Sequence, residues 1–238
     1  RHEIRAREIV ESLCPNVSIT LSSEVCPEIR EYERFSTACA NAYIQPLVNA
    51  YLQDLETRRR NLGMHCPMLL MQSGGGLGTL ADALRFPVRL VESGPAGGAL
   101  LSAELSRAFQ LERALSFDMG GTTAKLCIIN QGQPRTSREF EVGREYRFLP
   151  GSGIPLRLPV IEMVEIGAGG SSIARLDELG RIAVGPLSAG SEPGPACYGR
   201  GGTSPTVTDA DVALGRILPD RFAGGDLAFE KDASLTAI

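Results

Sequence analysis

The stretch LSFDMGGTTAKLCII (residues 115–129) decides how this 238-residue sequence folds. An apolar run ends at Asp118, the pair Gly120–Gly121 follows, two threonines come next, and a second apolar run begins. The polar turn NQGQ (130–133) closes that second run. The pattern predicts two consecutive strands of a hairpin, with the glycines in the turn.

The turn of this predicted hairpin carries groups that suit a phosphate. Glycines let backbone N–H groups approach phosphate oxygens, because no Cβ stands in the way. Thr122 and Thr123 add hydroxyl donors, and Asp118 can hold a hydrated Mg²⁺ or orient a water molecule. The alternative is a plain hairpin with a solvated aspartate. The sequence favours a phosphate site made by Gly120, Gly121, Thr122 and Thr123, with Asp118 as its catalytic and metal-binding residue.

A second glycine-rich loop, IGAGGSS (166–172), has two interpretations. Gly169, Gly170 and Ser171 can contact a nucleotide, or they can serve only a tight turn and close packing. Both interpretations stay open at this point.

The segment TVTDAD (206–211) also has two interpretations. Asp209 can lie near the site and bind the metal ion as a second carboxylate. Alternatively, Thr208 or Asp209 caps the N-terminus of the helix that follows. We expect the cap, with Asp209 also near the site. Cys197 has no histidine nearby in sequence, so we expect a buried thiol rather than a nucleophile.

Composition excludes several classes of protein. The formal net charge is −4, aromatic residues make up 5% and tryptophan is absent, so nucleic-acid binding is not expected. No apolar run approaches the roughly 20 residues of a membrane span. The six cysteines form no CxxC pair, which favours reduced thiols and a cytoplasmic protein.

The remaining sequence predicts helices, one buried strand and one exposed segment. Pro46 is expected to end or kink the helix in which it lies. The run PMLLMQ is typical of a strand buried on both faces. The predicted elements are a helix at 1–13, a short strand at 17–25, a helical region at 28–62, the buried strand at 67–72, an exposed excursion at 134–160 and a C-terminal helix.

The glycine-rich motifs occur in an order that resembles one known family. The hairpin motif itself resembles the phosphate-binding hairpin of the actin–hexokinase–Hsp70 ATPase superfamily. The motifs MQSGGGL, PVRLVESGPAGGAL, FDMGGTTAK, EIGAGGSSIA and GPLSAGSEPGPACYGRGGTSPTVTDADVALG narrow the match. Taken together, they resemble the hydantoinase A/5-oxoprolinase family, which includes N-methylhydantoinases and related subunits of acetone and acetophenone carboxylases. The resemblance covers essentially the whole chain.

This resemblance implies a fold and a chemistry. The implied fold is α/β, an actin/hexokinase/Hsp70-like (ribonuclease H-like) ATPase domain with a mixed sheet and flanking helices. The implied reaction uses ATP and Mg²⁺: ATP phosphorylates the carbonyl oxygen of a cyclic imide or lactam before water opens the ring. The alternatives are a subunit of an ATP-dependent ketone carboxylase and a non-catalytic nucleotide-binding or assembly module.

The resemblance also implies a division of the chain and a set of partners. Residues 1–66 are expected to form a helical segment that packs on the core, and residues 67–238 the ATPase-like domain. Family members carry a further N-terminal domain with its own Asp-x-Gly-Gly-Thr motif, and many work with a hydantoinase B-type subunit. This chain has one such motif and resembles the middle of those longer proteins. We therefore expect a central fragment that is inactive on its own.

Overall fold

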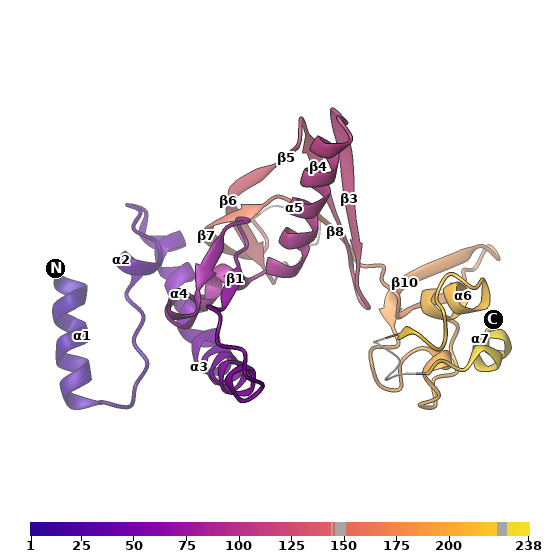
Figure 1. The fold of residues 1–238 in the computed structure, drawn as a ribbon, viewed down its shortest axis with the longest axis horizontal. Helices are drawn as coiled ribbons and strands as arrows, with labels where there is room; N and C mark the ends of the chain where they lie inside the picture. The colour runs from indigo at the N-terminus through magenta and orange to yellow at the C-terminus, as the bar shows by residue number, and fades with distance from the viewer. Residues whose placement is uncertain (144, 146–150, 223–227) are drawn as a thin grey trace. The chain divides into compact units, whose positions relative to one another are not determined.

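The computed structural model describes residues 1–143, 145, 151–222 and 228–238. It is a mixed α/β structure with antiparallel strand pairs, which confirms the predicted α/β class. No helix in these described ranges combines the length and the hydropathy that crossing a membrane requires. The helices and strands, labelled as in Figure 1, are α1 (His2–Leu13), α2 (Ser22–Val25), α3 (Glu31–Asn61), β1 (Leu69–Met71), β2 (Leu77–Thr79), α4 (Leu80–Arg85), η1 (Pro87–Leu90), α5 (Ser93–Ala108), β3 (Arg113–Met119), β4 (Ala124–Asn130), β5 (Gln133–Pro134), β6 (Thr136–Val142), β7 (Ile154–Ile161), β8 (Val164–Ile166), β9 (Ser172–Leu176), β10 (Ile182–Ser188), η2 (Ala196–Tyr198), α6 (Val207–Ala213) and α7 (Lys231–Ala237).

The chain forms two compact units. The first comprises Arg1–Ala114 and Ile128–Glu162, and the second comprises Leu115–Cys127 and Met163–Ile238. This division does not follow the predicted boundary between residues 66 and 67. The helical segment shares the first unit with α5 and the β6–β7 hairpin, because α3 packs directly against β7 and η1.

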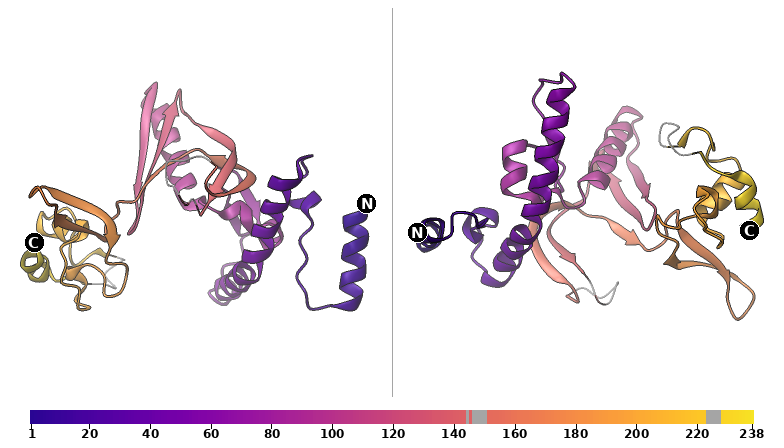
Figure 2. Two further views of the ribbon diagram at one scale, coloured as in Figure 1. Left: turned by 180° about the vertical axis from the view of Figure 1, so that it is seen from behind. Right: turned by 90° about the horizontal axis from the view of Figure 1, so that it is seen from below.

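The long helix α3 organises the first unit, and the right-hand view of Figure 2 shows it along its length. Two buried amide side chains fix it to the segments around it. Asn41 Nδ2 donates to the carbonyl of Arg85 at 3.1 Å, and Asn41 Oδ1 accepts from the Val88 N–H at 3.2 Å. Gln45 Nε2 donates to the carbonyl of Leu84 at 3.0 Å. The helix is therefore held by specific polar contacts as well as by apolar packing.

The prediction that Pro46 ends or kinks the helix is wrong in its first part, because α3 runs from Glu31 to Asn61 through this proline. A proline in a helix interior removes one backbone hydrogen bond and crowds the preceding turn. Here Asn41 and Gln45, in the turn before the proline, are both anchored. Tertiary contacts thus outweigh the local preference against the helix.

The core of the first unit depends on a hairpin that the sequence pattern does not predict. Residues 134–160 are expected to form an exposed excursion, but most of the described part of this range lies in β6 and β7. Strand β7 buries Leu156, Leu158 and Val160 against Val25, Phe86 and Val88. The charged residues of β6 hide the pattern, since only the β7 side of the hairpin alternates strongly between apolar and polar residues.

Two further predicted strands differ from the structure. Residues 17–25 form no strand and instead lead into the short helix α2. The hydroxyls of Ser18 and Thr20 donate to Gln45 Oε1 at 2.8 and 3.2 Å, so side chains rather than a sheet anchor this segment. In the 67–72 run, β1 pairs with β2 in a sheet of two described strands and is half-buried or exposed, so it is not buried on both faces.

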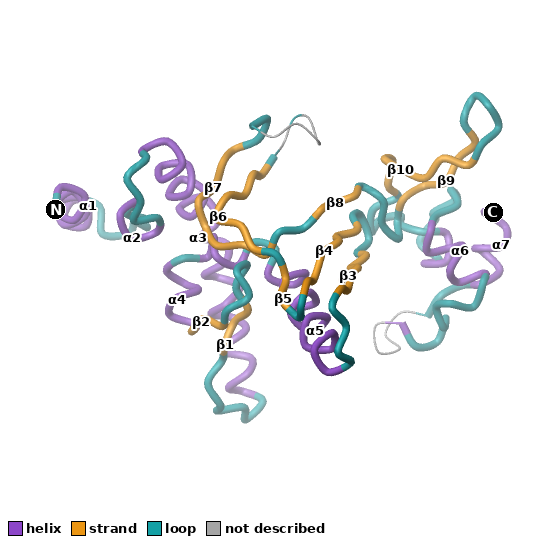
Figure 3. Tube along the Cα trace, turned by 90° about the horizontal axis from the view of Figure 1, so that it is seen from above, coloured by secondary structure: helices purple, strands orange, loops and turns teal. Residues whose placement is uncertain are grey.

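The predicted hairpin at 115–129 is present as β3 and β4. The two strands are neighbours in one sheet and are joined by residues 120–123, a connection short enough to require antiparallel strands. Strand β8 pairs with the first part of β4, with Ala124 opposite Ile166 and Leu126 opposite Val164. Figure 3 shows β3, β4 and β8 in orange, side by side.

The rest of the second unit is the β9–β10 hairpin with η2, α6 and α7. Its core contains Cys197, Val212 and Phe229, with Tyr198 stacked on Phe229 at 5.2 Å between ring centroids. The C-terminal helix predicted from the sequence is α7.

Candidate functional site

The turn between β3 and β4 is closed by its own backbone and held by a second loop. The Gly120 N–H donates to the Thr123 carbonyl at 2.9 Å. In the other direction, the carbonyls of Gly120 and Gly121 accept hydrogen bonds from the N–H groups of Gly170 and Ser171, at 2.9 and 2.7 Å. The structure therefore brings together the two glycine-rich stretches, which lie about fifty residues apart in sequence.

This approach is so close that position 169 requires glycine and Gly170 is crowded by a side chain. A Cβ on Gly169 would lie 2.6 Å from backbone atoms of Gly121 and Thr122. A Cβ on Gly170 would lie 2.7 Å from the Thr208 hydroxyl oxygen. Real Cβ atoms do not come this near to backbone, so the glycine at position 169 allows the two loops to touch.

The backbone N–H groups of the second loop, at residues 169–171, donate to acceptors within the protein. The Gly169 N–H donates to Ser172 Oγ at 2.8 Å, while the N–H groups of Gly170 and Ser171 donate to the hairpin. All three amides are thus occupied. This geometry supports the packing interpretation of Gly169, Gly170 and Ser171: they hold the hairpin turn in place rather than offering N–H groups to a ligand.

The hairpin turn itself still has donors to offer. Within the described residues, the N–H groups of Gly121 and Thr122 have no protein acceptor, and Thr122 is exposed. Thr123 is half-buried, and the side chains of both threonines make no hydrogen bond with these residues. Asp118 lies exposed near the end of β3 and forms no ion pair with the described part of the chain. The turn therefore presents amide donors, hydroxyls and one carboxylate on the same short segment.

Asp209 has a different environment, which indicates that it stabilises the fold. It is fully buried, and its two oxygens accept hydrogen bonds from five groups. These donors are the N–H groups of Ala196, Cys197 and Thr206 and the hydroxyls of Thr206 and Ser234. Burial acts to raise the pKa of this carboxyl, but the Thr206 hydroxyl and the N–H donors outweigh it, so the pKa is lowered and the group stays ionised.

The cap at the start of α6 follows from the same contacts. Thr206 is the N-cap and Asp209 lies at the third helical position, in a capping box. The predicted cap is therefore present and Asp209 takes part in it by accepting the Thr206 N–H, but the N-cap residue is Thr206 rather than Thr208 or Asp209. Since both oxygens of Asp209 are filled by protein donors, the prediction that Asp209 binds a metal ion does not fit this structure.

Asp118 suits a magnesium ion that is bound by a single protein carboxylate rather than by a cluster of ligands. Among the described residues, no group of three or more His, Cys, Asp or Glu side chains lies close enough to form a metal site. Mg²⁺ that accompanies a nucleotide needs only one or two protein carboxylates, because water and phosphate oxygens complete its shell. An exposed carboxylate next to free amide donors meets that requirement.

Cys197 is buried, as expected. Burial, together with the neighbouring Asp209 carboxylate, raises the pKa of its thiol to about 12. A thiol with such a pKa is protonated at neutral pH and is a poor nucleophile.

Two residues support the second loop in a role that the sequence does not predict. Ser172 accepts the Gly169 N–H, and the Thr208 N–H donates to the Gly170 carbonyl at 2.8 Å. The sequence shows a serine after the glycine pair and a threonine before Asp209, but it does not show that these two segments pair.

Comparison with known proteins shows which family the chain resembles. A family model described as hydantoinase/oxoprolinase matches residues 34–238. The Methanocaldococcus jannaschii protein MJ0964 is 45% identical over 240 residues, covering 100% of this chain and 35% of that protein. The alpha subunit of caprolactamase from Pseudomonas jessenii is 36% identical over 237 residues, covering 100% of this chain and 33% of the subunit.

Two solved structures have similar folds. The nucleotide-free structure of acetone carboxylase, from work on ATP-dependent acetone carboxylation, matches with a TM-score of 0.74 and 25% identity over 99% of this chain and 32% of its own. The crystal structure of the ATP-dependent caprolactamase from Pseudomonas jessenii matches with a TM-score of 0.66, over 100% of this chain and 33% of its own. The chain thus spans about a third of the length of these relatives. It belongs to the hydantoinase/oxoprolinase family.

Proposed function

We propose that this chain supplies one phosphate-binding part of an ATP-dependent enzyme that activates the carbonyl of a cyclic amide for ring-opening hydrolysis. The observation that carries the proposal is the hairpin turn at 120–123, whose free amide donors lie next to the exposed carboxylate of Asp118. The family supports it, since one relative is named as an ATP-dependent caprolactamase.

Each residue of the turn has a separate task in this proposal. The N–H groups of Gly121 and Thr122 and the hydroxyls of Thr122 and Thr123 bind phosphate oxygens, in the manner of the actin-type hairpins that this turn resembles. Asp118 orients a water molecule or holds Mg²⁺ through its hydration shell. When bound, Mg²⁺ neutralises phosphate charge that develops during transfer. The loop at 169–171 keeps the turn rigid, so that its donors are oriented before the nucleotide binds.

The proposed chemistry uses ATP to weaken a stable bond. An amide carbonyl is a poor electrophile, and transfer of the γ-phosphoryl group to its oxygen makes the carbon more reactive toward water. The ring then opens to a carboxylate and an amine, and ADP and inorganic phosphate are released. Substrates of the N-methylhydantoin and 5-oxoproline type share the required ring amide.

A second candidate is the ATP-dependent carboxylation of a ketone. Similarity to the acetone carboxylase structure, which has the higher TM-score of the two, favours it. Both reactions begin with ATP and a carbonyl group, so the turn at 120–123 would have the same role in each. A subunit of the hydantoinase B type would be the partner in either enzyme, in line with the "subunit alpha" in the name of a relative. Six free cysteines favour a cytoplasmic location for the protein.

The test is Asp118→Asn in the full-length protein, with Asp220→Asn as a matched control that removes one exposed carboxylate from the same unit. We expect phosphate release from Mg-ATP to fall by about 100-fold or more for Asp118→Asn, because positioned charges supply most of the catalysis of phosphoryl transfer. The control should stay within about twofold of wild type, since it removes no proposed contact. Turnover of Asp118→Asn within about tenfold of wild type would show that this carboxylate is not central.

A further inference from the structure

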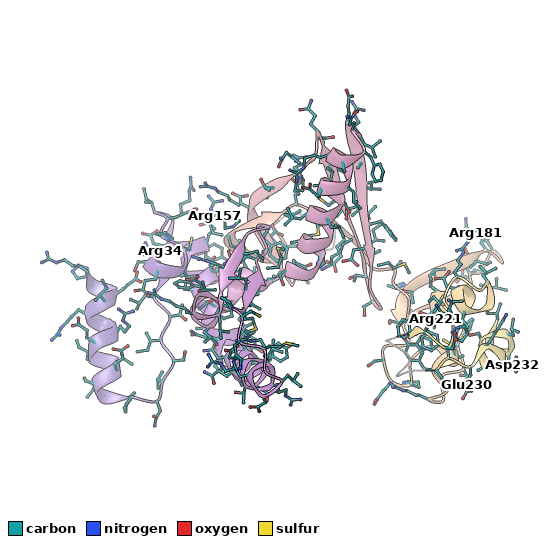
Figure 4. The ribbon with its side chains drawn as sticks, in the orientation of Figure 1. Arg34, Arg157, Arg181, Arg221, Glu230 and Asp232 are labelled. Carbon is teal, nitrogen blue, oxygen red and sulfur yellow. The ribbon has the colours of Figure 1, made fainter. Side chains whose placement is uncertain are left out.

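A pocket of about 490 Å³ lies wholly within the first unit. Arginines from three different elements line it: Arg89 from η1, Arg138 from β6 and Arg157 from β7. We call it the arginine pocket, and Arg157 is labelled in Figure 4. Its volume falls in the range of small-molecule sites.

The positive charge of this pocket is only partly neutralised. Among the described residues, Glu28 is the one carboxylate that lines it, and Glu28 Oε2 accepts from Arg157 Nε at 2.8 Å. Arg157 also forms an ion pair with Glu139. Arg89 and Arg138 form no ion pair with a described residue, and the Arg89 guanidinium lies over the Phe86 ring at 4.5 Å from its centroid. Asp82 interacts electrostatically with Arg89 from beyond ion-pair distance, and no described carboxylate pairs with Arg138, so the three arginines are only partly neutralised.

The wall of the pocket is built around an irregularity in the β6–β7 hairpin. The register shifts between the pairs Ser137–Val160 and Glu139–Arg157, so Arg138 alone faces Leu158 and Pro159. Such bulges change the direction of a side chain and are common beside binding sites.

The turn at 72–75, which contains Gly74, packs against this bulge from the other side. The Ile161 N–H donates to the Ser73 carbonyl at 2.8 Å, and the Ser73 N–H donates to the Arg89 carbonyl at 2.8 Å. A Cβ on Gly74 would lie 3.1 Å from the Pro159 Cβ, so the turn fits tightly against the strand. The backbones that carry Arg89 and Arg138 are therefore fixed relative to each other.

The pocket also has an apolar side. Val25, Val88 and Leu158, all buried residues of the core, line it together with Pro159. A ligand that fits both sides has an anionic end and a hydrocarbon body. An inorganic anion would pair with the arginines but leave the apolar side in contact with water.

We propose that the arginine pocket binds a small aliphatic carboxylate, with its carboxylate on Arg89 and Arg138 and its hydrocarbon chain against Val25, Val88 and Leu158. The planar guanidinium group suits a carboxylate because it can donate two parallel hydrogen bonds. The inference stands apart from the proposed ATP chemistry, because it uses no residue of the turn at 120–123.

The test is calorimetric titration of the full-length protein with hexanoate and, separately, with inorganic phosphate. Three variants are compared: Arg138→Ala, Arg89→Ala and, as the matched control, Arg58→Ala, which removes an exposed arginine of α3 that pairs with Asp54. We expect saturable binding of hexanoate that weakens by about tenfold or more in the first two variants and by less than about twofold in the control. Phosphate should bind more weakly than hexanoate.

Hydrogen exchange locates the site independently of the variants. Hexanoate should slow amide exchange in β6 and in the turn at 72–75. A ligand that binds equally well to Arg138→Ala and Arg58→Ala, or that protects neither segment, would overturn the proposal. Phosphate binding as tight as that of hexanoate would refute the aliphatic class. Absence of saturable hexanoate binding by the wild-type protein would also count against the proposal. Circular dichroism checks that each variant is folded, and Arg138→Gln replaces Arg138→Ala if that variant is not.

Discussion

At the scale of single residues, the second unit depends on glycines that touch backbone and on one buried carboxylate. Gly169 lies against the turn of the β3–β4 hairpin, and Asp209 joins η2, α6 and α7 through hydrogen bonds. The sequence shows which residue types stand at these positions. The glycine pair followed by two threonines also predicts the turn at 120–123. The sequence does not predict that both carboxylate oxygens of Asp209 accept hydrogen bonds from the protein, because the donors come from residues 12 to 25 positions away as well as from its own cap.

Gly169→Ala tests the close approach of the two loops. The new methyl group would lie 2.6 Å from the backbone of Gly121 and Thr122, so the loops must separate. We expect a loss of about 1–3 kcal/mol in the free energy of unfolding. Urea denaturation measures it, and nucleotide binding by the full-length protein should weaken in parallel. The control is Gly98→Ala in α5, where a Cβ meets nothing within 4 Å. This control should be neutral or more stable by about 0.5–1 kcal/mol, because alanine favours the helix. Equal effects of the two substitutions would contradict the packing argument.

Asp209→Asn tests the buried carboxylate and its pH dependence. At neutral pH we expect a loss of about 2–4 kcal/mol, since an amide cannot accept all five hydrogen bonds. The folded pKa of Asp209 is lowered, so its stabilising contribution is present above the unfolded pKa of about 3.9 and is lost as the pH falls through the folded value. The difference in unfolding free energy between wild type and variant should therefore shrink as the pH drops below about 4. Denaturation curves at several pH values measure this, and a difference that does not change with pH would rule out the ionised carboxylate as the source.

At the scale of elements, local patterns predict some segments and fail where a distant partner decides the structure. The hairpin of β3 and β4 has apolar strands and a glycine turn in adjacent sequence, so its pattern is complete. Strand β7 alternates in its own sequence, but the pattern alone does not show that Val25 and Val88, which precede it by more than sixty residues, pack on its apolar side. The residues at 17–25 have a strand-like alternation, but no strand in the described part of the chain pairs with them, and Gln45 accepts hydrogen bonds from the hydroxyls of Ser18 and Thr20 instead. Contacts between residues this far apart cannot be predicted from the pattern of a single sequence.

Pro46→Ala tests how far tertiary contacts hold α3 against its own sequence. The proline gives up one helical hydrogen bond, and an alanine N–H would restore it to the carbonyl of Ala42, four residues earlier in the helix. We expect a gain of about 1–2 kcal/mol in unfolding free energy, reduced somewhat by the greater freedom of the unfolded chain. Leu47→Ala is the control, because Leu47 is 78% exposed and should change stability by less than about 0.5 kcal/mol. A destabilised Pro46→Ala variant would mean that the proline shapes the helix for packing.

At the scale of the whole molecule, the chain contains one Asp-x-Gly-Gly-Thr hairpin and spans about a third of the length of its relatives. Phosphoryl transfer depends on charges and donors that converge on the phosphate from several directions. This chain offers the donors of one turn and the carboxylate of Asp118, while the amides of Gly169, Gly170 and Ser171 are used internally. Phosphate oxygens that the turn does not reach would stay hydrated, and water weakens each electrostatic contact to the transition state.

The isolated chain of 238 residues should therefore bind Mg-ATP weakly and hydrolyse essentially none. Calorimetry and a phosphate-release assay, run beside the full-length protein, measure both quantities. Asp118→Asn gives the background, since it should leave the already low signal of the isolated chain unchanged while lowering that of the full-length protein. A dissociation constant below about 1 μM, equivalent to about 8 kcal/mol of binding free energy, would show that one hairpin suffices to bind the nucleotide. Turnover equal to that of the full-length protein would mean that the whole catalytic site lies within these residues, and that the donors absent from the turn come from elsewhere in the same chain.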